Sequence, residues 1–385
     1  MRKGWEYKKL GEVCTIKAGY TPKKNELSDN GAYPYYKVAD MNTLGNDVYL
    51  DITSSYKIDA NKLFPKGAIV FPKNGAAVST NKKRILKYDS IVDLNTGVAI
   101  FPKSINEKFA YYWFIDTDFK KYVRGGALPT LDIKSLKDKP FPSIDKSTQL
   151  AIVTELDKIN ELIRLKKEQL KDFDNLAQSL FYEMFGDPVE NEKGWEVKKL
   201  GEIGEFKNGL NFSKDENGHS IKFLGVSDFQ NKKSIASDQL AYISLSERVQ
   251  EDYLLKTGDI VFVRSNGKKE LIGRSVKMYI TEPTTYSGFC IRCRITDEKV
   301  DKDYIAILLK TPIIRQFMTN SGRGCNISNL NQKVLNSIPT ILPPLPLQRL
   351  FAQRIEQIER EKSEVQKSIQ DLETLLASRM QYWFE

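Results

Sequence analysis

The chain contains the same short sequence twice. GWEYKKLG begins at Gly4 and GWEVKKLG begins at Gly194, 190 residues later, and seven of the eight positions are identical. A looser match continues to Gly19 and Gly209. A duplication of this size predicts two similar folding units, and a chain of 385 residues is long enough for each of them to bury a hydrophobic core.

The match resumes further along both copies. Residues 66–71 (KGAIVF) align with residues 257–262 (TGDIVF), and both predict a turn followed by a buried strand. Residues 136–140 align with residues 335–339 at an offset of 199, so the second copy carries extra residues in its loops. Short apolar runs separated by Gly, Pro and Asn predict a mixed α and β domain in each copy.

Each copy is followed by a heptad pattern, in which the steps between apolar positions alternate between four and three residues. The first pattern consists of Ile152, Leu156, Ile159, Ile163, Lys166, Leu170, Phe173, Ala177, Leu180 and Met184, and only Lys166 interrupts its apolar character. The second, 199 residues later, consists of Phe351, Ile355, Ile358, Lys362, Val365, Ile369, Leu372, Leu376, Arg379 and Trp383, of which Lys362 and Arg379 are polar. Each pattern predicts a helix of roughly 36 to 39 residues, about 55 Å long.

The ends of these helices are also predicted. Asp145 or Ser147 can cap the first helix, and Gly186 followed by Asp-Pro is a stop signal. We expect the two helices to pack against each other in antiparallel orientation, related by a pseudo-twofold axis. An alternative arrangement, in which each helix docks separately on its own domain, is also compatible with the pattern.

The predicted fold class is therefore α+β, with two α/β domains in tandem and two long antiparallel coiled-coil helices. We place the first domain at residues 1–144, the first long helix at 145–186, the second domain at 187–345 and the second long helix at 346–385.

Charge and composition narrow the setting. Lys and Arg total 59 against 50 Asp and Glu, so the net charge is +9, which favours a polyanionic partner. The chain has no run of about 20 apolar residues and no apolar segment behind its first basic residues, so we expect no export or membrane insertion. Four sparsely placed cysteines do not resemble a disulfide framework, and we expect a cytoplasmic protein.

The whole arrangement resembles the specificity subunits of type I restriction-modification systems. The resemblance rests on the Gly-Trp-Glu element that opens both domains and on the long helix that follows each of them, entered through Gln149 and Gln348. It implies that each domain is a target-recognition domain that reads one half of an asymmetric bipartite DNA sequence. The helices would set the spacer between the halves and dock the modification subunits.

The resemblance also implies the partners. They are double-stranded DNA, two modification (methyltransferase) subunits and two restriction (translocase/endonuclease) subunits. Those subunits would bind S-adenosylmethionine, ATP and Mg, so this chain would have no cofactor, metal or catalytic residue of its own and would not be an enzyme by itself.

Catalytic motifs are absent from the sequence. His219 is the single histidine, and neither a phosphate-binding loop of the Gly-x-x-x-x-Gly-Lys-Ser/Thr type nor an Asn/Asp-Pro-Pro-Tyr/Phe motif occurs. Cys290 and Cys293 would point to opposite faces of a strand, and we interpret them as structural rather than zinc ligands. Glu6 and Glu196, each followed by lysine two positions on, fit a polar strand edge better than a metal-dependent nuclease site.

Two other functions compete with DNA recognition. One is a stand-alone DNA-binding nuclease, against which the missing catalytic motifs weigh. The other is a coiled-coil adaptor that binds no nucleic acid, against which the paired basic loops weigh.

The candidate DNA-binding residues lie in loops rich in Gly, Asn, Lys and Arg, because forked donors and amides read bases while positive charge holds phosphates. In the first domain they are Thr21, Lys23, Lys73, Asn74, Ser79, Thr80, Asn81, Lys82, Lys83, Arg84, Arg124 and Thr130. In the second domain they are Asn211, Lys214, Arg264, Ser265, Asn266, Lys268, Lys269, Arg274, Arg323, Asn326 and Asn329.

Overall fold

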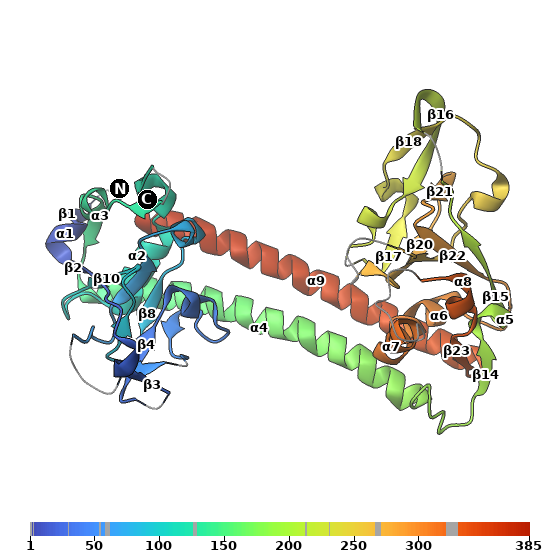
Figure 1. The fold of residues 1–385 in the computed structure, drawn as a ribbon, viewed down its shortest axis with the longest axis horizontal. Helices are drawn as coiled ribbons and strands as arrows, with labels where there is room; N and C mark the ends of the chain where they lie inside the picture. The colour runs from blue at the N-terminus through green and yellow to red at the C-terminus, as the bar shows by residue number, and fades with distance from the viewer. Residues whose placement is uncertain are drawn as a thin grey trace. The chain divides into compact units, whose positions relative to one another are not determined.

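The two copies of the repeat form two sheets with the same order of strands (Figure 1). The structure is a computed structural model that describes residues 2, 4–29, 31–53, 55–57, 62–125, 129–211, 214–230, 232–265, 271–320 and 330–385. The chain divides into unit 1, made of Met1–Glu168 and Gln366–Glu385, and unit 2, made of Gln169–Val365. Each unit therefore contains one α/β domain and a part of each long helix.

Unit 1 contains a five-stranded sheet of order β2-β10-β7-β8-β5 and a second, four-stranded sheet of order β3-β6-β4-β9. The central strand β7 is buried throughout, and its first three residues, Ile, Val and Phe, favour strands, as expected for the middle of a sheet. The elements are β1 (Glu6–Lys9), α1 (Leu10–Val13), β2 (Thr15–Ala18), β3 (Leu27–Ser28), β4 (Tyr33–Tyr36), β5 (Tyr49–Leu50), β6 (Tyr56–Lys57), β7 (Ile69–Pro72), β8 (Arg84–Leu86), β9 (Ile91–Val92), β10 (Thr96–Ile100), α2 (Glu107–Asp116), β11 (Val123–Arg124), β12 (Thr130–Leu131), α3 (Ile133–Lys137) and β13 (Pro140–Ser143).

Unit 2 repeats this plan with a five-stranded sheet of order β15-β22-β19-β20-β17. Its elements are β14 (Glu196–Lys199), α5 (Leu200–Ile203), β15 (Gly204–Asn208), β16 (Lys214–Leu224), β17 (Ser234–Ala236), β18 (Tyr242–Leu245), β19 (Ile260–Val263), β20 (Ser275–Tyr279), β21 (Thr284–Tyr286), β22 (Cys290–Ile295), α6 (Lys302–Leu308), α7 (Pro312–Asn320), α8 (Gln332–Asn336) and β23 (Pro339–Leu342). In both units the opening GWE element becomes a strand that pairs with the last strand of the domain, β1 with β13 and β14 with β23.

The two long helices are α4 (Lys146–Phe185) and α9 (Leu345–Phe384), each 40 residues long. All the heptad positions named above are buried or half-buried. Asp145 caps α4, because its carboxylate accepts a hydrogen bond from the Thr148 amide at 2.9 Å. Gly186 follows the last residue of α4 with φ of 75°, the left-handed conformation expected of a glycine stop.

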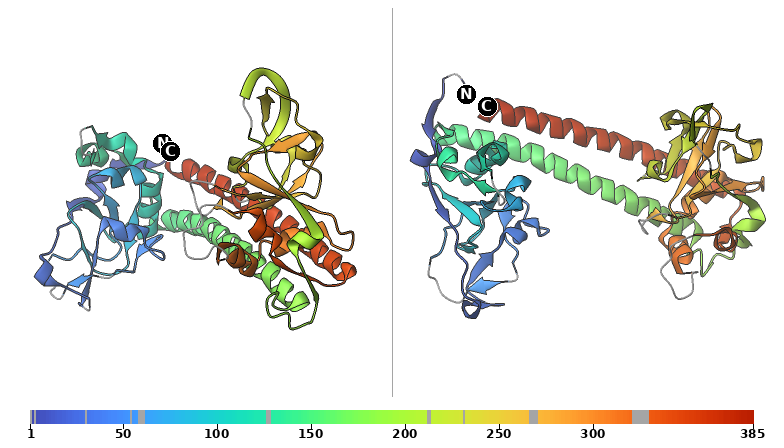
Figure 2. Two further views of the ribbon diagram at one scale, coloured as in Figure 1. Left: turned by 45° about the vertical axis from the view of Figure 1, so that its right-hand side comes forward. Right: turned by 45° about the horizontal axis from the view of Figure 1, so that its top comes forward.

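Within unit 1, the beginning of α4 lies alongside the end of α9 (Figure 2). Arg379 binds the Glu155 carboxylate, and further along α4 Lys167 pairs at 2.8 Å with Glu373, which comes earlier in α9. From the first contact to the second, the residue number increases along α4 and decreases along α9, so the two helices are antiparallel. The ends of the chain also meet here, because the ring of Trp5 stacks on Trp383 with centroids 6.0 Å apart.

Within unit 2, the end of α4 lies alongside the beginning of α9 in the same antiparallel sense. Lys362 pairs with Asp174, and the ring of Phe181 packs edge-on against Phe351 with centroids 5.7 Å apart. The predicted helix-to-helix packing is therefore confirmed, and the alternative of two helices docked separately is wrong. The packing buries an apolar stripe that would otherwise face water on both helices.

A buried glutamine joins each long helix to its domain. In unit 1 the Gln149 side-chain oxygen accepts a hydrogen bond from the Asn106 amide at 2.8 Å, and its nitrogen donates to the Ile144 carbonyl at 2.9 Å. In unit 2 Gln348 accepts from the Asp301 amide at 2.8 Å and donates to the Pro343 carbonyl at 2.7 Å. The two glutamines that align in the sequence thus tie the start of each helix to the cap of a domain helix, α2 or α6.

Replacement of Gln149 by Leu is expected to destabilise unit 1 by about 2 kcal/mol or more, because a buried amide and a buried carbonyl are left without hydrogen-bond partners. Faster amide hydrogen exchange in peptides of α2 would report this destabilisation, since exchange measures local as well as global opening. Gln370→Leu is the control, because Gln370 is an exposed glutamine of α9 in the same unit. Equal protection of α2 in the two variants would contradict the role assigned to Gln149.

Candidate nucleic-acid interface

Strand ends and turns of unit 2 meet at one end of its five-stranded sheet. Arg264, just after β19, donates its backbone N–H to the Phe289 carbonyl at 2.8 Å, and its own carbonyl accepts from Leu330 at 2.8 Å. The end of β15 joins them, because Gly209 N–H donates to the Cys290 carbonyl at 3.0 Å. We call this edge the loop end of unit 2.

The same hydrogen bonds occur in unit 1. Lys73, just after β7, donates its N–H to the Asn95 carbonyl and accepts from Leu131, both at 2.8 Å. Gly19, at the end of β2, donates to the Thr96 carbonyl at 3.0 Å. This edge is the loop end of unit 1, and these three backbone hydrogen bonds match the three described for unit 2.

The glycines at the two loop ends are required by close packing. A Cβ atom at Gly19 would lie 2.0 Å from the Asp93 carbonyl oxygen, and one at Gly209 would lie 2.1 Å from the Ser287 carbonyl oxygen. Only glycine fits at such a distance. The sequence match between Gly19 and Gly209 therefore reflects a turn that is pressed against the end of the neighbouring strand in both units.

In unit 1 the structure brings three of the predicted loops together. Asn74 forms an isolated β-bridge with Thr130, and Thr21 accepts a long hydrogen bond of 3.4 Å from the Leu94 amide, one residue before Asn95. Lys73 lies in the same cluster, and Lys23 is exposed in the turn that follows Thr21. On β11, which pairs with β12, the exposed side chain of Arg124 forms an ion pair of 2.9 Å with Asp132.

The predicted stretch 79–84 divides between surface and core. The exposed hydroxyls of Ser79 and Thr80 donate to the carbonyls of their own turn, and Lys82 donates to Asn42. Asn81 has a positive φ of 56° and accepts from the Phe119 amide at 2.9 Å, so it shapes the turn.

Lys83 and Arg84 belong to the fold of unit 1. Lys83 is fully buried, donates to the Thr117 carbonyl at 2.7 Å and lies over the Phe119 ring, and its burial lowers the pKa of its ammonium group to about 7. Arg84 donates to three backbone carbonyls, among them that of Met41 at 2.8 Å. We therefore leave both residues out of the candidate interface, because their donors serve the interior.

In unit 2 the described candidates gather at the loop end. Asn211 is exposed beside Gly288, and Ser265 follows Arg264 with its amide 3.4 Å from the Phe289 carbonyl. Arg274 donates to the Gln230 carbonyl at 2.6 Å. The side chain of Lys214, at the start of β16, and the residues Asn266, Lys268, Lys269, Arg323, Asn326 and Asn329 lie outside the described part of the chain.

Sequence reasoning missed two apolar side chains at these turns. Phe289 is 60% exposed and Leu94 is 53% exposed, although both are large hydrophobic residues. Apolar side chains at such positions contact thymine methyl groups or unstacked base steps in protein–DNA complexes. A phenylalanine directly after Ser-Gly, within a turn between two strands, is the sequence signal that could have identified Phe289.

The two cysteines of β22 are buried in the core, and the glutamates of the Glu-x-Lys elements form surface ion pairs. Burial raises the pKa of both Cys290 and Cys293 to about 12, and the two side chains belong to different core clusters on opposite faces of β22. Glu6 and Glu196 are exposed, and each pairs with the lysine two residues on. Among the described residues, no group of three or more His, Cys, Asp or Glu side chains is placed to hold a metal ion.

A family model matches the chain twice. The family described as "Type I restriction modification DNA specificity domain" matches residues 2–172 and residues 192–374, so each match covers one α/β domain and most of the long helix that follows it. No helix in the described ranges combines the length and the apolar character that a membrane span requires.

Curated relatives match nearly the whole chain. The chain is 21% identical to the type I restriction enzyme StySPI specificity subunit of Salmonella potsdam, over 98% of this chain and 87% of that protein. It is 24% identical to the type I restriction enzyme MjaIX specificity subunit of Methanocaldococcus jannaschii, over 97% of this chain and 91% of that protein.

Solved structures share the fold. A type I restriction-modification system S subunit from M. genitalium superposes with a TM-score of 0.54 at 16% identity, covering 99% of this chain and 96% of that chain. A chain from a study of complex assembly and conformational transition of the type I R-M system superposes with a TM-score of 0.66 at 16% identity, covering 100% and 98%. The predicted fold class is thereby confirmed.

Replacement of Gly209 by Ala is expected to lower the stability of unit 2 by about 1–3 kcal/mol, the usual range for an overpacked site, because the new methyl group collides with a backbone carbonyl. Thermal unfolding followed by circular dichroism measures the destabilisation. Gly225→Ala is the matched control, since a Cβ there would have its nearest neighbour at 3.5 Å. If both variants unfolded at the temperature of the unmodified protein, the close contact at the loop end would be refuted.

Proposed function

This chain belongs to the type I restriction-modification DNA specificity family as one of its specificity subunits, and we propose that its two units bind the two halves of a single interrupted DNA target. The observation that carries the proposal is the loop end, which recurs in both units with the same backbone hydrogen bonds. Two similar frames on one chain are suited to two half-sites of one duplex.

The side chains on the two frames differ, so the target should be asymmetric. Lys73 and Asn95 of unit 1 occupy the positions of Arg264 and Phe289 of unit 2, as their shared hydrogen bonds indicate. An arginine fork suits the acceptor edge of guanine, whereas a lysine and an amide offer different donors and acceptors. Each unit would therefore select a different half-site.

We propose that chemistry belongs to the partner subunits. Two modification subunits would transfer the methyl group from S-adenosylmethionine, and two restriction subunits would use ATP and Mg for translocation and cleavage. The single histidine and the absence of phosphate-loop and amino-methyltransferase motifs from the sequence support this division. The exposed polar faces of α4 and α9 would supply the docking surface for the modification subunits.

The purified chain is expected neither to methylate nor to cut DNA, and methylation should begin when its cognate modification subunit and S-adenosylmethionine are added. Mapping of methylated adenines in the source genome would supply the target for this assay. Arg264→Gln should weaken binding of that target by roughly 10-fold or more, because one forked contact to a base is worth about 1–3 kcal/mol.

Lys299→Gln is the control for the Arg264 variant, because Lys299 is exposed and follows β22 at the end of the strand opposite to Phe289. Methyl transfer by the chain alone would refute the proposed role. A loss of target binding that is equal in the two variants would show that the loop end does not read DNA.

We further propose that the length of the paired helices determines the spacer between the half-sites. A seven-residue insertion in each helix beside the Lys167–Glu373 ion pair would preserve the heptad phase. It adds about 10 Å of helix, so the spacer of the methylated target is expected to lengthen by up to about three base pairs of 3.4 Å each. Sequencing of methylated sites would measure the change, and altered half-sites would contradict the proposal.

A further inference from the structure

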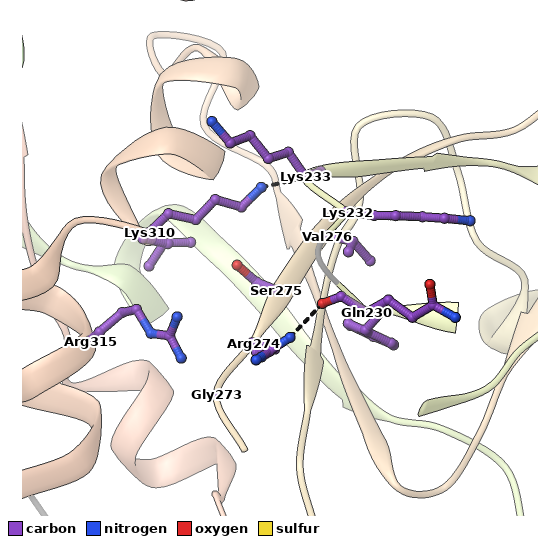
Figure 3. A pocket seen from close by; sticks show the side chains of 11 residues that line it. Gln230, Lys232, Lys233, Gly273, Arg274, Ser275, Val276, Lys310 and Arg315 are labelled. Carbon is purple, nitrogen blue, oxygen red and sulfur yellow. Dashed lines mark hydrogen bonds between the residues drawn. The ribbon is translucent and has the colours of Figure 1, made fainter. Parts of the chain in front are cut away.

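A cavity of about 250 Å³ opens in unit 2 beside the loop end. Five cationic side chains line it, and none of the lining residues carries a carboxylate; the five are Lys232, Lys233, Arg274, Lys310 and Arg315. Figure 3 shows Lys310, Arg315 and Arg274 near the small side chain of Ser275, and the side chain of Lys232 extending away from Arg315. We call this cavity the basic pocket. Its volume would hold several water molecules of about 30 Å³ each, so a hydrated anion fits.

The basic pocket faces the same edge as the proposed DNA-reading residues. Arg274 precedes β20, and its carbonyl accepts the Val263 amide at 2.9 Å, one residue before Arg264. Lys232 and Lys233 precede β17, which runs parallel to β20. Neighbouring strands are about 4.8 Å apart, so β17 lies about 10 Å from β19, within the width of about 12 Å of a DNA major groove.

Small residues create the basic pocket. The repeat aligns Ile69 with Ile260, and these residues pair with Ile85 and Lys277 respectively. Ile85 and Lys277 are therefore equivalent positions in the two units. One residue earlier in each strand, Arg84 corresponds to Val276, and two residues earlier Lys83 corresponds to Ser275.

The equivalent place in unit 1 is occupied by its own basic side chains. Lys83 fills the interior there, and Arg84 donates to backbone carbonyls. Ser275 and Val276 are too short to reach as far, and the space they leave is open to a ligand.

Two of the five cationic side chains are accessible to a ligand. Lys232 and Arg315 are exposed, and within the described ranges their side chains form no hydrogen bond or ion pair. Lys233 pairs with Glu359 at 2.6 Å, and Lys310 donates to the Lys233 carbonyl at 2.7 Å. Burial, followed by the charge of Lys233, lowers the pKa of Lys310 to about 8, so a bound anion would relieve crowding of like charges.

We propose that the basic pocket seats a phosphodiester group of the DNA backbone beside the half-site read by unit 2, an inference that rests on the function proposed above. Arg315 contacts the phosphate oxygens with the charge of Lys310 behind it, and Lys232, whose side chain extends away from Arg315, neutralises the adjoining stretch of the backbone. A phosphate contact fixes the position of a protein on a duplex without reading its sequence. Unit 2 therefore contributes a backbone anchor that unit 1 replaces with its own buried Lys83.

The test measures how the affinity of the full chain for a duplex without its target depends on salt. In the double variant Lys232→Gln with Arg315→Gln, the slope of log affinity against log salt is expected to fall by about 0.9 for each phosphate that the variant no longer neutralises. If the double variant no longer neutralises one phosphate, it binds the duplex more weakly than the unmodified chain, and this difference in affinity becomes about threefold smaller when salt is raised from about 50 to 200 mM. Lys299→Gln with Lys302→Gln removes the same charge from exposed positions at the opposite end of β22 and should leave the slope unchanged.

The outcomes separate this inference from the proposed function. If the unmodified chain binds no duplex, the proposed function itself fails. If it binds with a steep slope that the pocket variant shares, only the phosphate seat is overturned.

A second arm adds inorganic phosphate at matched ionic strength and measures the unfolding temperature. Stabilisation that is missing from the pocket variant, together with an unchanged duplex slope, would make the basic pocket a free-anion site and overturn its assignment to DNA. If the double variant unfolds at a lower temperature than the unmodified chain, the salt dependence is measured instead with each single variant, Lys232→Gln or Arg315→Gln.

Discussion

The structure depends on a constraint that follows from helix length. A 40-residue helix with one apolar stripe is stable in water only if the stripe is covered along its whole length. In unit 1 the stripe of α4 is covered by α9 near Glu155 and Arg379, and in unit 2 it is covered by α9 near Phe181 and Phe351. A buried glutamine at the start of each long helix ties that helix to the α/β domain before it.

The apolar stripe brings the two helices together, and buried or half-buried polar groups determine their register and their position on the domains. Gln149 and Gln348 are buried and satisfied, so each tolerates only one position of the helix start relative to the α2 or α6 cap. Glu155 binds both Arg379 and Trp383, which fixes the register of the two helices within unit 1. A half-buried polar contact of this kind contributes little net free energy, but it disfavours the neighbouring registers that a purely apolar seam would allow.

Sequence reasoning succeeded where one period or one repeat carries the information. The heptad positions, the Asp145 cap and the Gly186 stop follow from local rules, and the duplication predicts two domains of one fold. It was less successful for single side chains. Lysine and arginine in a polar loop are normally at the surface, but tertiary contacts bury Lys83 against Phe119 and turn Arg84 toward backbone carbonyls. The basic pocket depends on segments that are distant in the chain, so no local pattern reveals it.

The loop ends are held by main-chain hydrogen bonds and by the close approach of Gly19 and Gly209 to neighbouring carbonyls. None of these contacts depends on which side chain stands at Lys73, Asn95, Arg264 or Phe289. Under the function proposed above, main-chain atoms hold the loop ends in place and side-chain atoms of the same residues read the bases. A lineage that exchanges those side chains can acquire a new sequence preference without first repairing its architecture, which makes this framework unusually open to diversification.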